Sequence, residues 1–515
     1  MDVAGTQDTL VTGPHGLFQI LQPVRDAEGR PLTRPGAGQL PVPLLQPVHQ
    51  ASLRAAMEQV LGLPLPRALL RLDHACRNYL RAHGSSHDLP APQPGPAAIQ
   101  AEGEDRPAVG YWLLSPGGEE EDHRYDLYSS IYTAGDACTS GAVERIFPHE
   151  HAHVVMTSMV GTGEDLRKST RMHLSTSITD YYTAFYEGWG ISHETLALDL
   201  TSNHRLRTQE RFDPSPLAHW ICTVEQAHRA HLVRQNAFIH VTAEPDPSLV
   251  ADMTSTAFLP GVLKDPQQLL SSEGVAAAFF YRVLTSDRLL AEAPDPGFFQ
   301  AFLSDPGPLA TGCFSPFERL CLKLYHSAGR WLTRPRLDPG RPLLTQLVVG
   351  YGRDFPAEKV DLYRLFLETT CCATVSTEAP QLYHNLVWAG RSGDIPRLKT
   401  LAGQWRQLFS AALERALATE DLESRVGPEL WLTNPGCLVT PALWLSEPTR
   451  PHTFNLNAAT PADLLAVPGM SPDAARAILE HRRSLGHFTS VAQAAGLPGV
   501  PQVLLTMGPG GPGPV

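Results

Sequence analysis

The sequence lacks several patterns that define whole classes of protein. Its eight cysteines include no Cys-x-x-Cys pair, which argues against a zinc site built from cysteines and favours free thiols in a reducing compartment. Met1 to Pro23 has no basic segment followed by an apolar run, and no later stretch is apolar enough to suggest a membrane span. These absences predict a cytoplasmic protein without a membrane partner.

The chain also lacks a long basic run, and its formal net charge is -12. The whole chain is therefore not expected to bind nucleic acid, although a locally neutral module could still contact phosphates. Hydrophobic residues make up 43% and charged residues 18% of its 515 positions, which is typical of a globular protein with a substantial core. The 46 prolines and 41 glycines predict many loops and linkers.

Two proline-rich or polar segments, 89–107 and 446–453, are predicted to be linkers. They suggest a division of the chain into four parts: an N-terminal region with its linker at 1–107, a catalytic-type domain at 108–300, a helical region at 301–445 and a compact unit at 454–505.

Continuous apolar runs ending at breakers predict strands near 108–116 and 126–134, with the charged turn GGEEEDHR between them. Helical spacing of apolar residues predicts helices within 47–83, 140–159 and 179–200, and throughout much of 215–430. The expected fold class is α+β: a mixed sheet and helix subdomain, then a large mainly helical region, then a small all-α module.

The most informative segment is Phe147-Pro148-His149-Glu150-His151-Ala152-His153. On a helix, positions i and i+4 share one face, so His149 and His153 can present two imidazoles to one metal ion. Glu150 follows the first of these ligands, and its carboxylate can reach a water activated by the metal as a general base. The segment therefore predicts the core of a hydrolytic zinc site.

A catalytic zinc ion takes three protein ligands and leaves one position open. Glu187, in the segment Glu187-Gly188-Trp189-Gly190, lies 34 positions after His153 in a second helical stretch and is the predicted third ligand. His151 points about 100° away from the ligand face and is expected to be exposed or to support the ligands from outside. Asp180 or Glu194 could accept the other N–H of a ligand histidine.

These two motifs resemble those of the gluzincin metallopeptidases. HEHAH matches the His-Glu-x-x-His signature, and EGWGISHE is similar to the E-G-F-A-x-x-x-E segment of the aminopeptidase branch, with Glu194 at the second acidic position. The resemblance covers about residues 108–300 and implies Zn²⁺ as cofactor, peptide or protein substrates and a gluzincin-like fold. The chain departs from the family in a longer interval before Glu187 and in lacking a clear Gly-x-Met-Glu-Asn motif, which puts exopeptidase specificity in doubt.

The donor that would stabilise a tetrahedral oxyanion stays open at this point. Residues of suitable donor chemistry are His173, Tyr181, Tyr182, His193, His240 and Tyr281, each of which could equally pack in the core or lie at the surface.

The C-terminal segment 454–500 contains two similar turns, Val467-Pro468-Gly469-Met470 and Leu497-Pro498-Gly499-Val500. Thr460 and Ser471 are each followed by proline, which predicts two helices with hydroxyl N-caps. The pattern N-L-N-x-A, then P-G, then A-x-x-I-x-x-x-R closely resembles the helix-hairpin-helix module of competence-type DNA receptors.

That resemblance implies phosphate binding without base reading, through the hairpin and the helix that follows it. The positions that carry this role over are Gly469, Ser471 and Arg476, with Ser471 standing where a second glycine is usual. Balanced charges in the module leave a protein-contact or purely structural role open as the alternative.

Three functional hypotheses follow from these motifs. The favoured one is a zinc metallopeptidase that the C-terminal module directs to DNA or to DNA-bound proteins. The alternatives are a metal-independent or inactive scaffold that binds DNA or protein, and a zinc hydrolase that does not cleave peptides. The intact Glu150 favours a working hydrolase over the scaffold.

Overall fold

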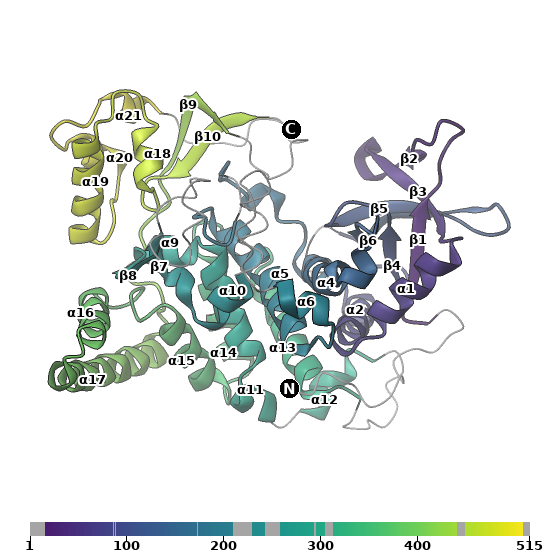
Figure 1. Ribbon diagram of the computed structural model, residues 1–515, viewed down its shortest axis with the longest axis horizontal. Coiled ribbons are helices and arrows are strands. Elements are labelled where there is room, and N and C mark those ends of the chain that lie inside the picture. The colour runs from purple at the N-terminus through teal and green to yellow at the C-terminus, as the bar shows by residue number, and fades with distance from the viewer. Residues whose placement is uncertain are drawn as a thin grey trace. The chain divides into compact units, whose positions relative to one another are not determined.

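A computed structural model describes residues 16–85, 87, 89–171, 174–209, 229–242, 258–292, 295–303, 313–439 and 449–507. The chain forms two compact units. Unit 1 combines Met1–Thr162, Trp189–Arg211 and Leu284–Leu337, and unit 2 combines Gly163–Gly188, Phe212–Val283 and Asp338–Val515. Helix α5 (Tyr181–Leu200) is continuous and contributes residues to both units (Figure 1).

Unit 1 is built on a six-stranded sheet with the order β1-β4-β6-β5-β3-β2. Strand β1 pairs with β4 in parallel and also with β3 in antiparallel, so the ladder of strands closes on itself. The long antiparallel pair β5 and β6 carries an irregularity between Val109 and Tyr111. The strands are β1 (Phe18–Pro23), β2 (Thr33–Pro35), β3 (Pro41–Pro47), β4 (Ala97–Ala101), β5 (Arg106–Leu114) and β6 (Glu120–Ile131).

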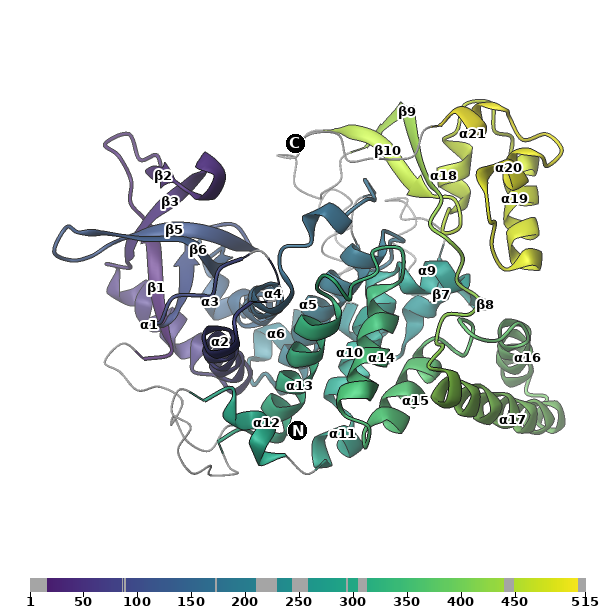
Figure 2. The ribbon, with the colours of Figure 1, turned by 180° about the vertical axis from the view of Figure 1, so that it is seen from behind.

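The helix α4 (Ala142–Val160) is central to unit 1, where it contacts α2, α13 and β6 (Figure 2). Its apolar side chains are almost all buried, and Val143 and Phe147 of this helix join Ile99 of β4 in one hydrophobic core. This burial on several sides explains why the helix forms in spite of Pro148, whose nitrogen cannot donate to the preceding turn. The other helices of unit 1 are α1 (Ala51–Leu61), α2 (Pro64–His83), α3 (Ala137–Ser140), α6 (His204–Gln209), α11 (Asp287–Ala291), α12 (Pro296–Gln300) and α13 (Pro316–Trp331).

Unit 2 is mainly helical in its described residues. It contains two short antiparallel pairs, β7 (His240–Thr242) with β8 (Phe258–Leu263) and β9 (Trp431–Val439) with β10 (Arg450–Asn455). Its helices are α9 (Pro266–Leu270), α10 (Glu273–Leu284), α14 (Leu343–Asp354), α15 (Lys359–Thr369), α16 (Ala379–Arg391), α17 (Ile395–Thr419), α18 (Pro461–Leu465), α19 (Pro472–Leu485), α20 (Val491–Ala495) and α21 (Val503–Thr506).

The structure confirms the α+β fold class: a mixed sheet with helices, a large helical region and a C-terminal helical module. The helices predicted within 47–83, 140–159 and 179–200 are present as α1, α2, α4 and α5. In the part of the chain that the structure describes, no helix combines the length and apolar character needed to cross a bilayer.

Three local predictions are wrong. Residues 97–101 form the buried strand β4 rather than part of a linker, because β1 and β6 pair with this segment on its two sides. The sequence AAIQA by itself does not predict that pairing. The charged segment before Asp126 belongs largely to β6, which begins at Glu120. The described end of the second predicted linker forms β10, from Arg450. The predicted domain boundaries at 107, 300 and 445 stay predictions.

Candidate functional site

His149 and His153 lie one turn apart on α4, and their side chains converge. Their Nε2 atoms are 3.2 Å apart, and both side chains are largely buried. Two nitrogen ligands at ordinary zinc distances in a tetrahedral site are separated by about 3.3 Å. The spacing on α4 therefore matches the predicted use of both imidazoles by one ion.

The backbone of α5 borders these two nitrogens at Gly190. A Cβ atom added at Gly190 would lie 2.7 Å from Nε2 of His153 and 2.8 Å from Nε2 of His149. Carbon atoms do not approach polar nitrogens this closely without displacing them. Because glycine has no side chain, the two imidazole rings can approach each other beside this position without a clash.

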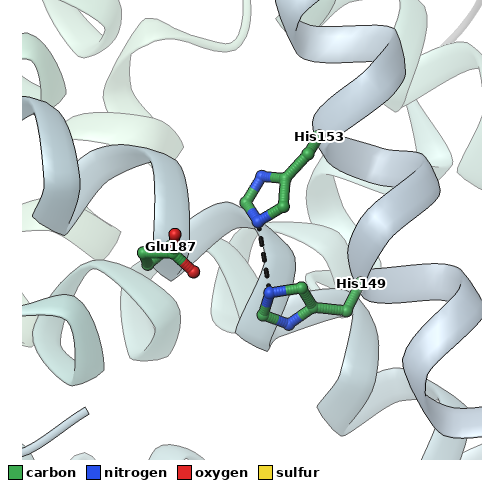
Figure 3. A group of neighbouring side chains, drawn as sticks. All are labelled: His149, His153 and Glu187. Atoms are coloured by element: carbon green, nitrogen blue, oxygen red, sulfur yellow. Dashed lines mark hydrogen bonds between the residues drawn. The ribbon is translucent and has the colours of Figure 1, made fainter. Parts of the chain in front are cut away.

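Glu187 lies one turn before Gly190 on the same helix, so both face the same side of α5. One ligand atom from each of His149, His153 and Glu187 can be chosen so that all three lie within 4.8 Å of one another (Figure 3). Two imidazoles and a carboxylate are a donor set that suits a catalytic zinc ion. The three predicted ligands are thus brought together, and their chemistry fits the metal.

Glu194 lies beside the first ligand histidine. One of its carboxylate oxygens is 3.5 Å from Nδ1 of His149, and the other accepts a hydrogen bond of 2.9 Å from Nη1 of Arg145. The carboxylate is 2% exposed, so little water screens these contacts. Such a carboxylate orients a ligand imidazole and raises its basicity.

Asp180, the other residue proposed to accept a hydrogen bond from a ligand histidine, binds backbone N–H groups instead. Its carboxylate accepts backbone hydrogen bonds from Thr183 at 2.7 Å and from Ser169 and Lys168 at 2.9 and 3.1 Å. It therefore satisfies free N–H groups at the start of α5 and fixes the preceding loop. Asp180 positions the helix that carries Glu187.

Glu150 and His151 follow His149 on α4 and are both buried. His151 packs on another face of the helix, where its Nδ1 is 2.9 Å from the hydroxyl of Ser129 and its Nε2 is 3.8 Å from a carboxylate oxygen of Asp73. Burial lowers the pKa of His151 to about 4, so its ring is neutral near pH 7. The alternative that His151 is exposed is wrong, because the core of unit 1 encloses it.

Two of the residues proposed as oxyanion donors have clear packing roles. His193 is fully buried, donates from Nδ1 to the carbonyl of Trp189 at 2.9 Å, and has its pKa lowered to about 4 by burial. Tyr182 stacks on Tyr186 with ring centroids 5.3 Å apart. His173 lies outside the described residues, and the choice of donor stays open.

The C-terminal module has its own hydrophobic core, which includes Leu464, Ile478 and Phe488. The two turns are alike, with φ of 80° at Gly469 and 79° at Gly499. A left-handed φ is costly for residues with a Cβ, which accounts for both glycines. The predicted caps are also present.

The two caps differ in detail. Thr460 forms a capping box with Asp463, and the hydroxyl of Ser471 accepts a hydrogen bond from the backbone N–H of Ala474 at 3.2 Å. Of the three proposed phosphate-binding residues, Gly469 lies in the turn before α19, Ser471 is the N-cap of α19, and Arg476 lies near the start of that helix. Arg476 is 66% exposed and lies 3.3 Å from the carboxylate of Asp473.

The same module is held within unit 2 by buried ion pairs that the sequence did not single out. Arg482 is 1% exposed and donates to Asp265 at 2.6 Å and to the carbonyls of Leu456 and Ala459 at 2.9 and 3.0 Å. These bonds satisfy a buried guanidinium and join α19 to the start of α9. The HRR sequence alone gives no signal that separates Arg482 from its exposed neighbour.

A second buried pair joins Asp463 to Arg171, and His452 Nε2 lies 2.7 Å from the same carboxylate. Burial alone would raise the pKa of Asp463. The charges of Arg171 and His452 nevertheless hold this pKa well below its usual range. The module is therefore packed into unit 2 through charged contacts on more than one side.

Comparison with known proteins finds a short motif in the C-terminal module. A model of the helix-hairpin-helix motif matches residues 451–505, which confirms this motif in the C-terminal module; the likeness to competence-type DNA receptors in particular stays a prediction. No curated protein matches the chain, and no solved structure matches it. The gluzincin resemblance of the remaining residues stays a prediction.

Proposed function

We propose that this chain is a zinc-dependent metallopeptidase. The observation that carries the proposal is the convergence of His149, His153 and Glu187 to within 4.8 Å, with both imidazole Nε2 atoms facing Gly190. A zinc ion bound by these residues would polarise a scissile carbonyl and lower the pKa of water at the site. The carboxylate of Glu194 lies 3.5 Å from Nδ1 of His149, where it can orient that imidazole toward the ion.

Glu150 is the residue that moves the proton. It follows His149 on α4 and is 8% exposed, so its carboxylate is held in a largely dry setting. It accepts a proton as water attacks the peptide carbonyl and delivers that proton to the nitrogen of the leaving amine. The part-buried guanidinium of Arg145 lies 2.9 Å from the buried carboxylate of Glu194 and balances its charge beside His149.

The test is cleavage of casein and of a labelled peptide by the purified full chain. We expect cleavage that a zinc chelator abolishes and that added zinc restores. Without the ion, the two histidines and Glu187 cannot activate water or polarise the peptide carbonyl. Stoichiometric zinc without cleavage of any peptide in a mixed library would instead favour a zinc hydrolase of another substrate class.

We also propose that the C-terminal module binds duplex DNA through its phosphates. The motif match at residues 451–505 and the left-handed turn at Gly469 support this role. Backbone N–H groups at the turn and at the start of α19 can hold a phosphate oxygen without reading bases. Such binding would place the peptidase site on DNA-associated proteins.

Replacing Gly469 with alanine should weaken duplex binding by about tenfold, the equivalent of one lost hydrogen bond to a charged group. Among the described residues, the new Cβ meets only Pro501, at 3.6 Å, so the change acts through the strained φ of 80° rather than through a clash. Fluorescence anisotropy with a labelled duplex measures the effect. Gly496→Ala, at a right-handed position with φ of -76°, is the control and should bind as the wild type does. Equal affinity of both variants would contradict the proposal.

A further inference from the structure

The helical hairpin formed by α16 and α17 carries a basic and aromatic surface that the proposed peptidase and hairpin-module functions do not use. The two helices contact each other along unit 2 and lie side by side in both views (Figures 1 and 2). Residues 379–419 contain five Arg or Lys residues and two carboxylates, in a chain whose net charge is -12. The hairpin therefore carries a net positive charge, whereas the rest of the chain is net negative.

An exposed tryptophan marks one face of α16. Trp388 is 49% exposed, the guanidinium of Arg391 lies 5.6 Å from its ring centroid, and the ring of His384 lies 6.1 Å from it on the preceding turn. Large aromatic side chains are usually buried, and an exposed one beside cations is a surface on which a planar group can stack.

Helix α17 also carries exposed cations. Ile395 is 52% exposed, and Lys399 and Arg406 are exposed at four and eleven residues beyond it. These spacings place the three side chains on one face of the helix, with the two cations about 10 Å apart along its axis. The carboxylate of Asp394 accepts a hydrogen bond from the backbone N–H of Arg397 and serves as the helix N-cap.

We infer that the α16–α17 hairpin binds single-stranded nucleic acid, with Trp388 as the stacking platform and Arg391, Lys399 and Arg406 as phosphate contacts. A positive groove or stripe with an aromatic ring is the combination that holds an unpaired strand, because every base has a π face and every linkage carries a charge. A protein partner would be expected to require a larger apolar centre than Trp388 and Ile395 provide. The inference rests on these residues and does not require the C-terminal module to bind DNA.

The experiment is anisotropy of a labelled 20-nucleotide oligothymidylate with the full chain, beside a duplex of the same length. Trp388→Ala should weaken single-strand binding by about tenfold, the effect of losing one stacked base, whereas Trp388→Phe should keep most of the affinity. The double variant Lys399→Glu with Arg406→Glu should weaken binding further and flatten its salt dependence.

The matched control is Arg205→Glu with Arg336→Glu, which makes the same charge change elsewhere on the chain. It should bind the oligonucleotide within about twofold of the wild type, since neither residue belongs to the α16–α17 hairpin. Gly469→Ala should reduce duplex binding and leave oligothymidylate binding unchanged, which separates this surface from the C-terminal module. Unchanged binding by the Trp388→Ala and Lys399→Glu/Arg406→Glu variants, or an equal loss in the control, would overturn the inference and leave a protein-contact face.

Discussion

Glu150→Gln is expected to lower the rate of peptide cleavage by about 10²- to 10⁴-fold, the usual contribution of a general base. Glutamine has nearly the same size and can still form hydrogen bonds at this buried position, but it cannot accept the proton of the attacking water. The zinc ligands are untouched, so bound zinc and thermal stability should match the wild type. Initial rates with a labelled peptide and elemental zinc analysis measure the two effects separately.

The matched control for this prediction is Glu144→Gln. Glu144 is also a buried carboxylate on α4, in its first turn, but it does not adjoin a predicted ligand. Its replacement should leave the cleavage rate within a few-fold of the wild type, because it has no part in proton transfer. Full activity of Glu150→Gln, or an equal loss in both variants, would show that Glu150 is not the base.

Gly190→Ala is expected to remove bound zinc and, with it, peptide cleavage. The added methyl would lie 2.7 and 2.8 Å from the two Nε2 atoms, so either the imidazoles must rotate or α5 must move away from α4. Either movement takes the ligand atoms out of the geometry that zinc requires. Overpacking of this kind also costs about 1–3 kcal/mol of folding stability. Zinc titration and thermal unfolding of the apo protein separate the two effects.

Gly403→Ala is the control for that substitution. Gly403 also lies inside a helix, α17, but a Cβ there meets nothing within 4 Å in the part of the chain that the structure describes. Alanine should therefore raise stability by about 0.5–1 kcal/mol through its better helix propensity and leave zinc binding unchanged. A Gly190→Ala protein that binds one zinc ion with wild-type affinity would contradict the proposed geometry of the site.

The parts of the molecule that the sequence predicts well depend on local signals. The i, i+4 spacing of His149 and His153 determines their common face as soon as α4 is recognised, and the structure shows their nitrogens meeting. Thr460 and Ser471 are likewise caps that act within three residues, and both are present. Such features need no knowledge of the rest of the fold.

The features that sequence reasoning missed or left open depend on distant partners. Strand β4 is short and rich in alanine, and only its pairing with β1 and β6 makes it a strand. Glu194 and Asp180 are equally plausible by spacing, and the choice between them depends on which one the approach of α5 to α4 brings to His149. Arg482 pairs with Asp265, 217 positions away, so its sequence neighbours give no hint of its burial.

We propose that His149, His153 and Glu187 together hold one zinc ion. Zinc content per chain of the purified wild type, measured beside Glu187→Ala after both are reconstituted with zinc and exhaustively dialysed, tests it most directly. We expect about one zinc ion per wild-type chain and little in the variant, since two imidazoles alone bind the ion too weakly to survive dialysis. A wild-type chain that retains no zinc, or a variant that retains as much as the wild type, would contradict the account.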